Sequence, residues 1–369
     1  MHYLRNTKNY KILESQEKSD RLLNEKLGYS KVNNAIIVPH IGCFDSNKNF
    51  IDGTWLHETT TFPYKDSYCQ NNFHIQKAVY MGCLVNIWGH CITDGIKRLW
   101  FLFSDYLKNI QNVSFVYTTV NEVPLPENYL KILKYIISNE IELVEIQQNT
   151  IVDELYIPDV SFYSTLDGKK IYFNEFSGTL KRLTNNYIKP QNFVSYDKIY
   201  LSRTALKSHF EFGEKYIEQV FQQAGFQIIH PEQYSLEEQL YLYENCNYFA
   251  SLEGSGAHNS LFCKPDTKVF IIRKSNSINP YQLTIDKISK VNECYIDAHF
   301  SIMNSKSKPW TGPFFVYVTK NLALCLNNEF QTNIQSHFPI FLFIKYICIS
   351  IFVKNKNLLR FVYHLIKTK

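Results

Sequence analysis

The segment that decides the fold is Lys198–Ile272, which reads KIYLSRTALKSHFEFGEKYIEQVFQQAGFQIIHPEQYSLEEQLYLYENCNYFASLEGSGAHNSLFCKPDTKVFII. Short runs of β-branched and aromatic residues alternate in it with stretches that carry a helical pattern of apolar residues. This alternation predicts strands and helices in turn, and therefore a parallel sheet. One strand should end at Ser202-Arg203, and another, YFASL, at the turn Glu253–Asn259.

The residues at these two strand ends suit a bound anion. The carboxyl ends of parallel strands share one edge of a sheet, where ligands bind. If a helix starts after Gly254–Ala257, its first N–H groups are available to a phosphate. Arg203 could hold two phosphate oxygens, with hydroxyl donors from Ser202 and Ser255. From the residues alone, a plain tight turn at the glycines and a surface ion pair at Arg203 remain equally open.

The segment carries five short motifs whose order and spacing are similar to those of family 61 glycosyltransferases. That group contains bacterial capsule and lipopolysaccharide enzymes and eukaryotic O-GlcNAc and xylosyl transferases. The resemblance implies a GT-B fold, in which two Rossmann-like α/β domains face a central cleft, an inverting mechanism, and usually no metal. The motifs are LSR (Leu201–Arg203), AGF (Ala224–Phe226), HPE (His230–Glu232), SLEEQ (Ser235–Gln239) and EGSGAHNSLF (Glu253–Phe262).

The resemblance implies that this half of the chain binds the nucleotide-sugar donor. Glu253 could accept hydrogen bonds from ribose or sugar hydroxyls. Asn259 could equally contact the sugar or brace its own loop. His230 follows a strand at the place where GT-B enzymes hold the nucleobase. Ser235 with Glu238 predicts a helix-capping box. The predicted donor-binding residues are Ser202, Arg203, His230, Glu232, Glu253, Gly254, Ser255, Gly256, Ala257, His258 and Asn259.

A second group of candidate residues lies in GHCITDGIKRLW, residues 89–100. His90, Asp94 and Arg98 are four residues apart, so a helix that begins near Gly89 would place all three on one face. A histidine and a carboxylate at this spacing could remove the proton from an acceptor hydroxyl. The spacing alone also fits an Asp94–Arg98 ion pair bridged by His90.

Here too the chain resembles family 61, whose N-terminal domain has His, three residues, Asp, and then a Pro-Arg-Leu-like step. The chain has Lys97 where that step has proline. The resemblance favours a catalytic role for this group, with Arg98 on the acceptor side. Our prediction is that Asp94 is the base and that His90 orients it or the substrate. The sequence leaves open which of Asp94 and His90 is the base.

The chain of 369 residues is long enough for two core-forming domains. A strand, a helix and a strand are predicted in turn at 112–120, 127–138 and 141–147, so the first half is also α/β. Residues 150–159 are expected to lead out of this domain, toward a linker at 189–197. We therefore predict domains at 1–190 and 191–330, followed by a basic, apolar helical tail at 331–369.

The tail carries the excess positive charge of the chain. Residues 331–369 hold six basic residues and no acidic residue, and the rest of the chain is close to neutral, which argues against nucleic-acid binding. The apolar run 338–353 is shorter than the ~20 residues that span a bilayer. It fits a helix on an anionic membrane surface, and a helix packed across the two domains is the alternative.

Nine cysteines without a CxxC pair, and no ligand spacing of His, Cys or Asp, predict no metal site. The first residues lack an apolar core, so we expect a cytoplasmic protein with reduced thiols, peripheral at the inner face of the membrane.

Taken together, the resemblance to family 61 and the residues that carry it imply an inverting, metal-independent glycosyltransferase that needs no cofactor. A nucleotide sugar, expected to be a UDP-sugar, is the donor, and a hydroxyl of a surface polysaccharide or lipid-linked glycan is the acceptor. Two alternatives stay open. The same fold could hydrolyse or epimerise the nucleotide sugar, or it could serve as a non-catalytic glycan-binding or assembly subunit.

Overall fold

The computed structural model describes residues 2–4, 11–12, 20–23, 27–56, 60–69, 73–137, 141–164, 170–206, 211–300 and 312–352. By its internal contacts the chain divides into unit 1, Met1–Leu13 with Pro190–Lys369, and unit 2, Glu14–Lys189. The first residues group with unit 1, and not with the segment 1–190 in which the sequence placed them, because β1 (His2–Leu4) pairs in parallel with β17 (Asn292–Asp297). Both units combine strands and helices, so the mixed α/β class is confirmed.

The sheet of unit 1 has a parallel core of five strands in the order β14-β12-β15-β16-β17, which β1 and the antiparallel β2 (Lys11–Ile12) extend. In chain order this is 2-1-3-4-5, the order of a doubly wound sheet, in which the connections change direction between β12 and β15. Ligands bind outside the carboxyl ends of the strands at such a point. The strands predicted from the sequence are confirmed as β12 (Lys198–Leu201), β14 (Gln227–Ile229), β15 (Tyr248–Leu252) and β16 (Lys268–Arg273).

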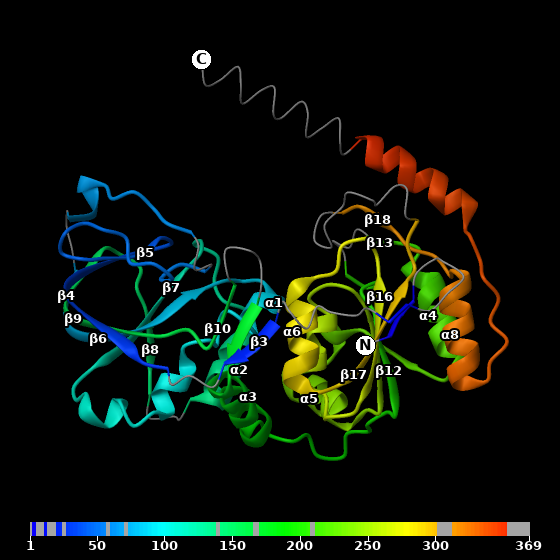
Figure 1. Cartoon of the computed structure of the whole chain (residues 1–369), viewed down its shortest axis with the longest axis horizontal. Helices are drawn as coiled ribbons and strands as arrows, with labels where there is room; N and C mark the ends of the chain where they lie inside the picture. The colour runs from blue at the N-terminus through cyan, green and yellow to red at the C-terminus, as the bar shows by residue number, and fades with distance from the viewer. Residues whose placement is uncertain are drawn as a thin grey trace. The chain divides into compact units, whose positions relative to one another are not determined.

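Helices cover both faces of this sheet (Figure 1). On one face, α4 (Glu214–Gln223) and α8 (Lys320–Phe330) share a buried apolar cluster with Tyr200, Phe270 and their neighbours. On the other face lie α5 (Leu236–Asn245), α6 (Pro280–Ser289) and the 3₁₀ helix η5 (Ala257–Phe262). The predicted capping box at the start of α5 is confirmed.

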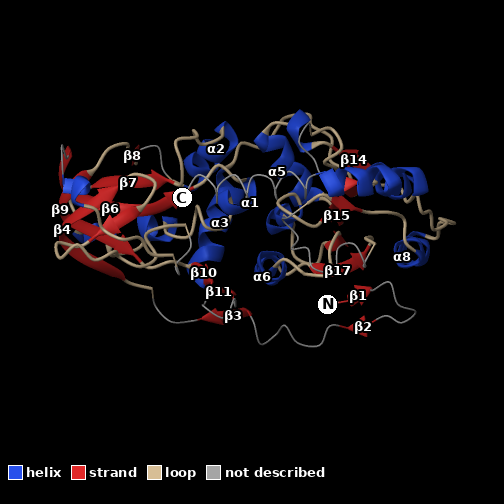
Figure 2. Cartoon of the chain, turned by 90° about the horizontal axis from the view of Figure 1, so that it is seen from above, coloured by secondary structure: helices blue, strands red, loops and turns tan. Residues whose placement is uncertain are grey.

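Unit 2 is built on a six-stranded mixed sheet in the order β5-β4-β9-β6-β7-β8 (Figure 2). The expectation that residues 150–159 lead out of the domain is wrong, because β9 (Thr150–Pro158) lies between β4 and β6. Its side chains Val152, Leu155 and Ile157 belong to the buried core of the unit, which holds the strand at the centre. The other strands are β4 (Tyr29–Val38), β5 (Gly42–Phe44), β6 (Phe73–Leu84), β7 (Ser114–Thr119) and β8 (Leu143–Glu145).

Smaller elements complete unit 2 beside this sheet. A three-stranded sheet is formed by β10 (Phe162–Ser164), β11 (Lys170–Phe173) and β3 (Asp20–Leu23). The two longer helices, α2 (Glu127–Ile136) and α3 (Asn174–Asn186), pack against one another. Short helical turns are α1 (Trp88–Cys91), η1 (Asp66–Cys69), η2 (Leu99–Phe103) and η3 (Leu107–Asn109).

A close contact between α2 and the segment after α1 holds that segment in place. Tyr129 of α2 is fully buried, and a Cβ added at Gly95 would lie 1.8 Å from its hydroxyl oxygen and 2.8 Å from the carbonyl oxygen of Cys91. Only glycine fits here, so Gly95 and Tyr129 together position the residues that follow α1.

In the tail, residues 340–352 form a helix, and residues 353–369 lie outside the described part of the chain. Phe343 and Tyr346 pack on Phe315 of unit 1, with ring centroids 5.0 and 5.6 Å apart. Within the described residues, no helix has the length and apolar character needed to cross a bilayer.

We predict that Gly95→Ala lowers the free energy of unfolding by about 1–3 kcal/mol, because the added methyl group overlaps a buried hydroxyl and a backbone carbonyl. Tyr129→Phe should recover part of this loss, since the Tyr129 hydroxyl has no hydrogen-bond partner among the described residues. Urea unfolding of both variants and the double variant measures the effect.

Gly178→Ala is the matched control. Gly178 lies inside α3, and a Cβ there meets nothing within 4 Å. Alanine should therefore stabilise by about 0.5–1 kcal/mol through its helix propensity. Equal effects of the two substitutions would contradict the packing described for Gly95.

Candidate functional site

The predicted donor-binding residues of unit 1 lie at one edge of its sheet. Leu201 of β12 is in register with Ile229 of β14 and Ser251 of β15. Ser202-Arg203, the short 3₁₀ turn η4 (Pro231–Gln233) with His230 before it, and the turn from Glu253 therefore follow three neighbouring strand ends. This edge includes the switch point between β12 and β15.

Two cationic side chains meet at Gly254. A Cβ built on Gly254 would lie 3.4 Å from Nη1 of Arg203 and 3.6 Å from Nζ of Lys274. Both groups contact Oε1 of Glu211 in β13 (Glu211–Phe212), at 3.7 Å from Arg203 and 2.6 Å from Lys274. The Lys274 and Glu211 side chains are buried, whereas that of Arg203 is 28% exposed. Glu211 can balance one of the two positive charges.

Lys274 is the functional candidate that sequence reasoning missed. It directly follows β16, so it comes from the next strand end along the same edge. No family motif quoted above reaches it, and its position directly after a predicted strand is the one signal that could have pointed to it. Lys274 contacts its partner only in the folded structure, because Glu211 is 63 residues away in the chain.

The turn at Gly254 leads into a short helix. Gly254 has a φ of +142°, a conformation in which side-chain-bearing residues are strained. The helix expected after this turn is present as η5, a six-residue 3₁₀ helix. A helix this short has a weak dipole, so the positive potential at the turn comes mainly from Arg203 and Lys274.

Carboxyl groups on α4 fix the loop that carries Arg203. The hydroxyl of Ser202 donates to Glu218 Oε1, and the backbone N–H of Arg203 donates to Oε1 of Glu214 at 3.1 Å. Burial raises the pKa of Glu214 to about 8. Ser202 thus closes the loop on α4, and its predicted role toward a phosphate stays a prediction.

Glu253 lies fully buried at the end of β15. One carboxyl oxygen accepts the backbone N–H of Asn279 at 2.7 Å, and the other, Oε2, accepts no hydrogen bond from the described residues. Burial raises the pKa of Glu253 to about 8, against the opposite effects of that N–H and of Lys274. Near neutral pH this carboxyl is largely protonated, so it adds little negative charge beside the turn.

Two predicted residues of the η5 helix brace the site. The side-chain amide of Asn279 donates to Nε2 of His258 when that nitrogen is unprotonated, at 3.2 Å. The amide of Asn259 donates to the carbonyl of Gly256 at 3.1 Å. Of the two roles that the sequence left open for Asn259, this contact supports bracing of the loop.

Gln239, to which the sequence assigned no role, holds the loop after β14. Its amide donates to the carbonyls of Pro231 at 2.8 Å and Tyr234 at 3.0 Å. In this loop His230 is half-buried and Glu232 is exposed. Gln239 thus keeps the backbone next to His230 in a defined conformation.

In unit 2, the predicted helix through His90, Asp94 and Arg98 is wrong, because α1 ends at Cys91 and residues 92–98 form turns. The Thr93 hydroxyl donates to the carbonyl of Gly89, and glycine at position 95 disfavours further helix. The contact expected four residues apart is nevertheless present, with Nδ1 of His90 2.6 Å from Oδ2 of Asp94.

Asp94 is the inner member of this pair. Its side chain is 2% exposed against 26% for His90, and its second oxygen lies 3.7 Å from Nζ of Lys97. Lys97, the residue in place of the proline in the family motif, is buried and donates to the carbonyl of Leu56 at 2.8 Å. The guanidinium group of Arg98 donates a hydrogen bond to the carbonyl of Gly53 at 3.0 Å. The predicted pair of His90 and Asp94 is therefore present.

A family model named Glycosyltransferase 61 matches residues 88–270. The chain belongs to glycosyltransferase family 61. The matched region begins at α1 and ends in β16, so it contains the His90–Asp94 pair and the strand ends around Gly254. No curated protein matches the chain. As a member of this family, the protein is a transferase of glycosyl groups.

Unit 2 of this glycosyltransferase has a hollow beside Arg98. Its volume is about 340 Å³, and Asp52, Asp159 and Tyr163 line it together with Arg98. A hollow with acidic, basic and hydroxyl groups can hydrogen-bond the hydroxyls of a sugar. Neither His90 nor Asp94 lines it.

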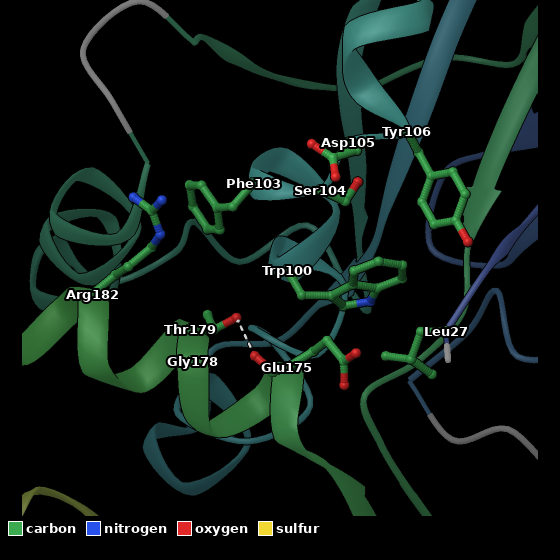
Figure 3. A pocket seen from close by; sticks show the side chains of 10 residues that line it. All are labelled: Leu27, Trp100, Phe103, Ser104, Asp105, Tyr106, Glu175, Gly178, Thr179 and Arg182. Carbon is green, nitrogen blue, oxygen red and sulfur yellow. Dashed lines mark hydrogen bonds between the residues drawn. The ribbon is translucent and has the colours of Figure 1, made fainter. Parts of the chain in front are cut away.

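A second hollow of about 340 Å³ lies between α3 and the segment around η2 (Figure 3). Figure 3 shows Arg182 beside Phe103 and the Glu175 carboxylate on the side of Trp100. The Arg182 guanidinium carbon is 3.6 Å from the centroid of the Phe103 ring, so this ring face is already covered. No predicted site residue lines this hollow.

We predict that Glu253→Gln becomes more stable relative to the natural protein as the pH rises. The Glu253 pKa is raised from its ordinary 4.5 to about 8, so its contribution to stability is complete below about pH 4.5 and is lost as the pH rises toward 8. In urea unfolding, the free energy of unfolding of the variant minus that of the natural protein should be more positive at about pH 8.5 than at about pH 5.5.

Glu232→Gln, at an exposed position on the same sheet edge, serves as the control and should show no such trend. If Glu253→Gln and the natural protein lose stability in parallel across this range, the Glu253 carboxyl is not held protonated by burial.

Proposed function

We propose that this family 61 chain is an inverting, metal-independent glycosyltransferase of GT-B architecture, which transfers a hexosyl or N-acetylhexosaminyl group from a UDP-sugar. The observation that carries the proposal is the pair of cations, Arg203 and Lys274, at the Gly254 turn. They lie at the edge of a doubly wound sheet where nucleotides bind.

On the donor side, the breaking bond leaves its electrons on the nucleoside diphosphate. Fixed positive groups at the point where that charge develops lower the barrier. Arg203 and Lys274 are suited to this role because Glu211 holds both in place before the donor arrives. In other transferases a divalent metal ion supplies this charge. Here we assign it to the two side chains.

Other groups at the same edge suit the remaining parts of the donor. The backbone beside His230, which Gln239 holds, lies at the end of β14, and this position suits a contact with the nucleobase. Glu253 has a buried oxygen near the turn that no described residue hydrogen-bonds, and this oxygen is suited to a ribose or sugar hydroxyl. Gly254–Gly256 leaves room for a phosphate to approach the backbone.

On the acceptor side we assign the base to His90 and the orienting role to Asp94, the reverse of the assignment predicted from the sequence. A carboxylate oxygen 2.6 Å from Nδ1 favours the proton on that nitrogen. Nε2 is then free of a proton and can accept one from a hydroxyl. Asp94, buried and in contact with Lys97, is less able to reach an acceptor.

The proposed reaction is a single displacement. The acceptor oxygen attacks the anomeric carbon as its proton moves to Nε2 of His90. The bond between that carbon and the diphosphate oxygen breaks, and the diphosphate leaves with its electron pair toward Arg203 and Lys274. The new glycosidic bond forms on the opposite face of the sugar, so the anomeric configuration inverts.

We propose a glycan acceptor, on a growing surface polysaccharide of the capsule or lipopolysaccharide type or on a lipid-linked precursor, and a place in the cytoplasm at the inner face of the membrane. The hollow beside Arg98 supports a sugar-binding acceptor side in unit 2. No cofactor is part of the proposal, and EDTA in the binding experiment below tests metal independence.

For the donor site, we predict that Arg203→Gln weakens binding of UDP by about tenfold to about 100-fold, the usual loss for a charge-assisted hydrogen bond. The pair Lys274→Met with Glu211→Gln should do the same without leaving an unpaired buried charge. Isothermal titration calorimetry with UDP, GDP and CMP, with and without EDTA, measures both effects and identifies the base of the donor.

Lys268→Met is the matched control. Lys268 begins β16 at the opposite edge of the sheet and pairs with Glu329, so its loss should leave UDP binding unchanged. No binding of any nucleotide by the natural protein would overturn the proposal and favour a non-catalytic glycan-binding subunit. Binding that EDTA abolishes would refute metal independence alone.

For the acceptor side, we predict that His90→Ala lowers kcat by about 100-fold to about 10,000-fold, the usual contribution of a general base. Added imidazole should restore part of the rate, since it can replace the missing base. Asp94→Asn should change the pH dependence of kcat while donor binding stays intact. Radiolabelled transfer from the UDP-sugar to a glycan acceptor provides the assay.

His74→Gln is the control for this experiment, because His74 forms a similar pair with Asp153 at 2.8 Å on the exposed side of unit 2. Full activity of His90→Ala would show that His90 is not the catalytic base and would favour Asp94 in that role. Release of free sugar at the same rate without an acceptor would instead indicate hydrolysis of the nucleotide sugar.

A further inference from the structure

The helix at residues 340–352 presents an apolar face that the described part of the chain does not cover. Phe341 is 85% exposed and Phe352 is 68% exposed. Ile340, Ile344 and Ile351 are each more than half exposed. Their spacing of one, three and four residues places them along one side of a helix. This is a continuous stripe and not a set of scattered surface residues.

The opposite side of the same helix is firmly attached to unit 1. Tyr346 is buried, with its ring 5.7 Å from Phe212 and 5.6 Å from Phe315. Phe343 packs on Phe315 and Phe300 at 5.0 and 5.2 Å. The helix, drawn near the C-terminal end of the chain in Figure 1, is therefore held on unit 1 by its buried side.

The charge of this part of the chain indicates what the stripe meets. Residues 331–369 contain Lys345, Lys354, Lys356, Arg360, Lys367 and Lys369, and no Asp or Glu. Lys345 is exposed on the helix itself, and the other five follow it directly in the sequence. Aromatic and branched apolar side chains beside basic residues are the composition of helices that lie in the surface of anionic membranes.

We propose that residues 340–352 dock unit 1 on an anionic lipid bilayer, with the helix parallel to the membrane and the Phe341–Phe352 side inserted among the acyl chains. A second copy of this chain is less favoured as the partner of this face. A twofold contact would bring together two tails whose charged residues are all basic. The docking is independent of the proposed transfer reaction, since it involves no residue of the donor or acceptor side.

Flotation with lipid vesicles tests the proposal on the full-length protein. Binding should be strong to vesicles of equal parts phosphatidylglycerol and phosphatidylcholine, weak to phosphatidylcholine alone, and reduced by added salt. The triple variant Phe341→Ser, Ile344→Ser, Phe352→Ser should lower the partition coefficient by at least about tenfold, because membrane binding scales with inserted apolar area.

Leu324→Ser is the matched control, an exposed leucine on α8 of the same unit, and should bind vesicles as the natural protein does. Circular dichroism verifies that the triple variant is folded, and UDP binding should be unchanged in it. Equal binding of the triple variant and the natural protein to the anionic vesicles would overturn the proposal. The proposal would also be overturned if light scattering showed a dimer for the natural protein and a monomer for the triple variant, while the triple variant still bound vesicles.

Discussion

The parallel register of β12, β15 and β16 is the constraint on which the donor side of this protein depends. Each strand ends at the same edge of the sheet, and the residue types that follow them are an arginine, a glycine and a lysine. A shift of one residue in any of these pairings would turn the side chains of that strand to the opposite face. The meeting of Arg203 and Lys274 at Gly254 is thus a direct product of strand pairing.

Burial shapes the charges around this edge. Glu211 is surrounded by two cations, whereas Glu214 and Glu253 lie in surroundings that raise their pKa values to about 8. Glu214 and Glu253 are therefore largely neutral near pH 7, whereas Glu211 pairs with Arg203 and Lys274. Two cationic side chains therefore lie beside a turn whose neighbourhood is rich in acidic residues.

In unit 2, the candidate catalytic pair lies in a turn and not at the ends of parallel strands. His90 and Asp94 are brought together by a turn, and that turn is held by Gly95 against Tyr129 and by the buried Lys97. Lys97 departs from the family pattern, yet its ammonium group adds a positive neighbour to Asp94. Lys97 thus contacts the same carboxyl group whose other oxygen lies 2.6 Å from Nδ1 of His90.

By itself the sequence determined β12, β14, β15 and β16, the helices between the first three of them, the capping box at Ser235 and the family. These features rest on local patterns, where apolar spacing and turn residues act within a few positions. The helix expected through Arg98 failed because buried contacts with Tyr129 and Leu56 outweigh a local helical pattern.

Only the tertiary structure decided the central place of β9, the pairing of β1 with β17, and the role of Lys274. Each of these depends on partners far away in the chain, such as Glu211 for Lys274. It also decided which side of the 340–352 helix is exposed, since apolar residues lie all around that segment in the sequence and packing on Phe315 selects the buried side. Spacing alone carries no information about such distant contacts.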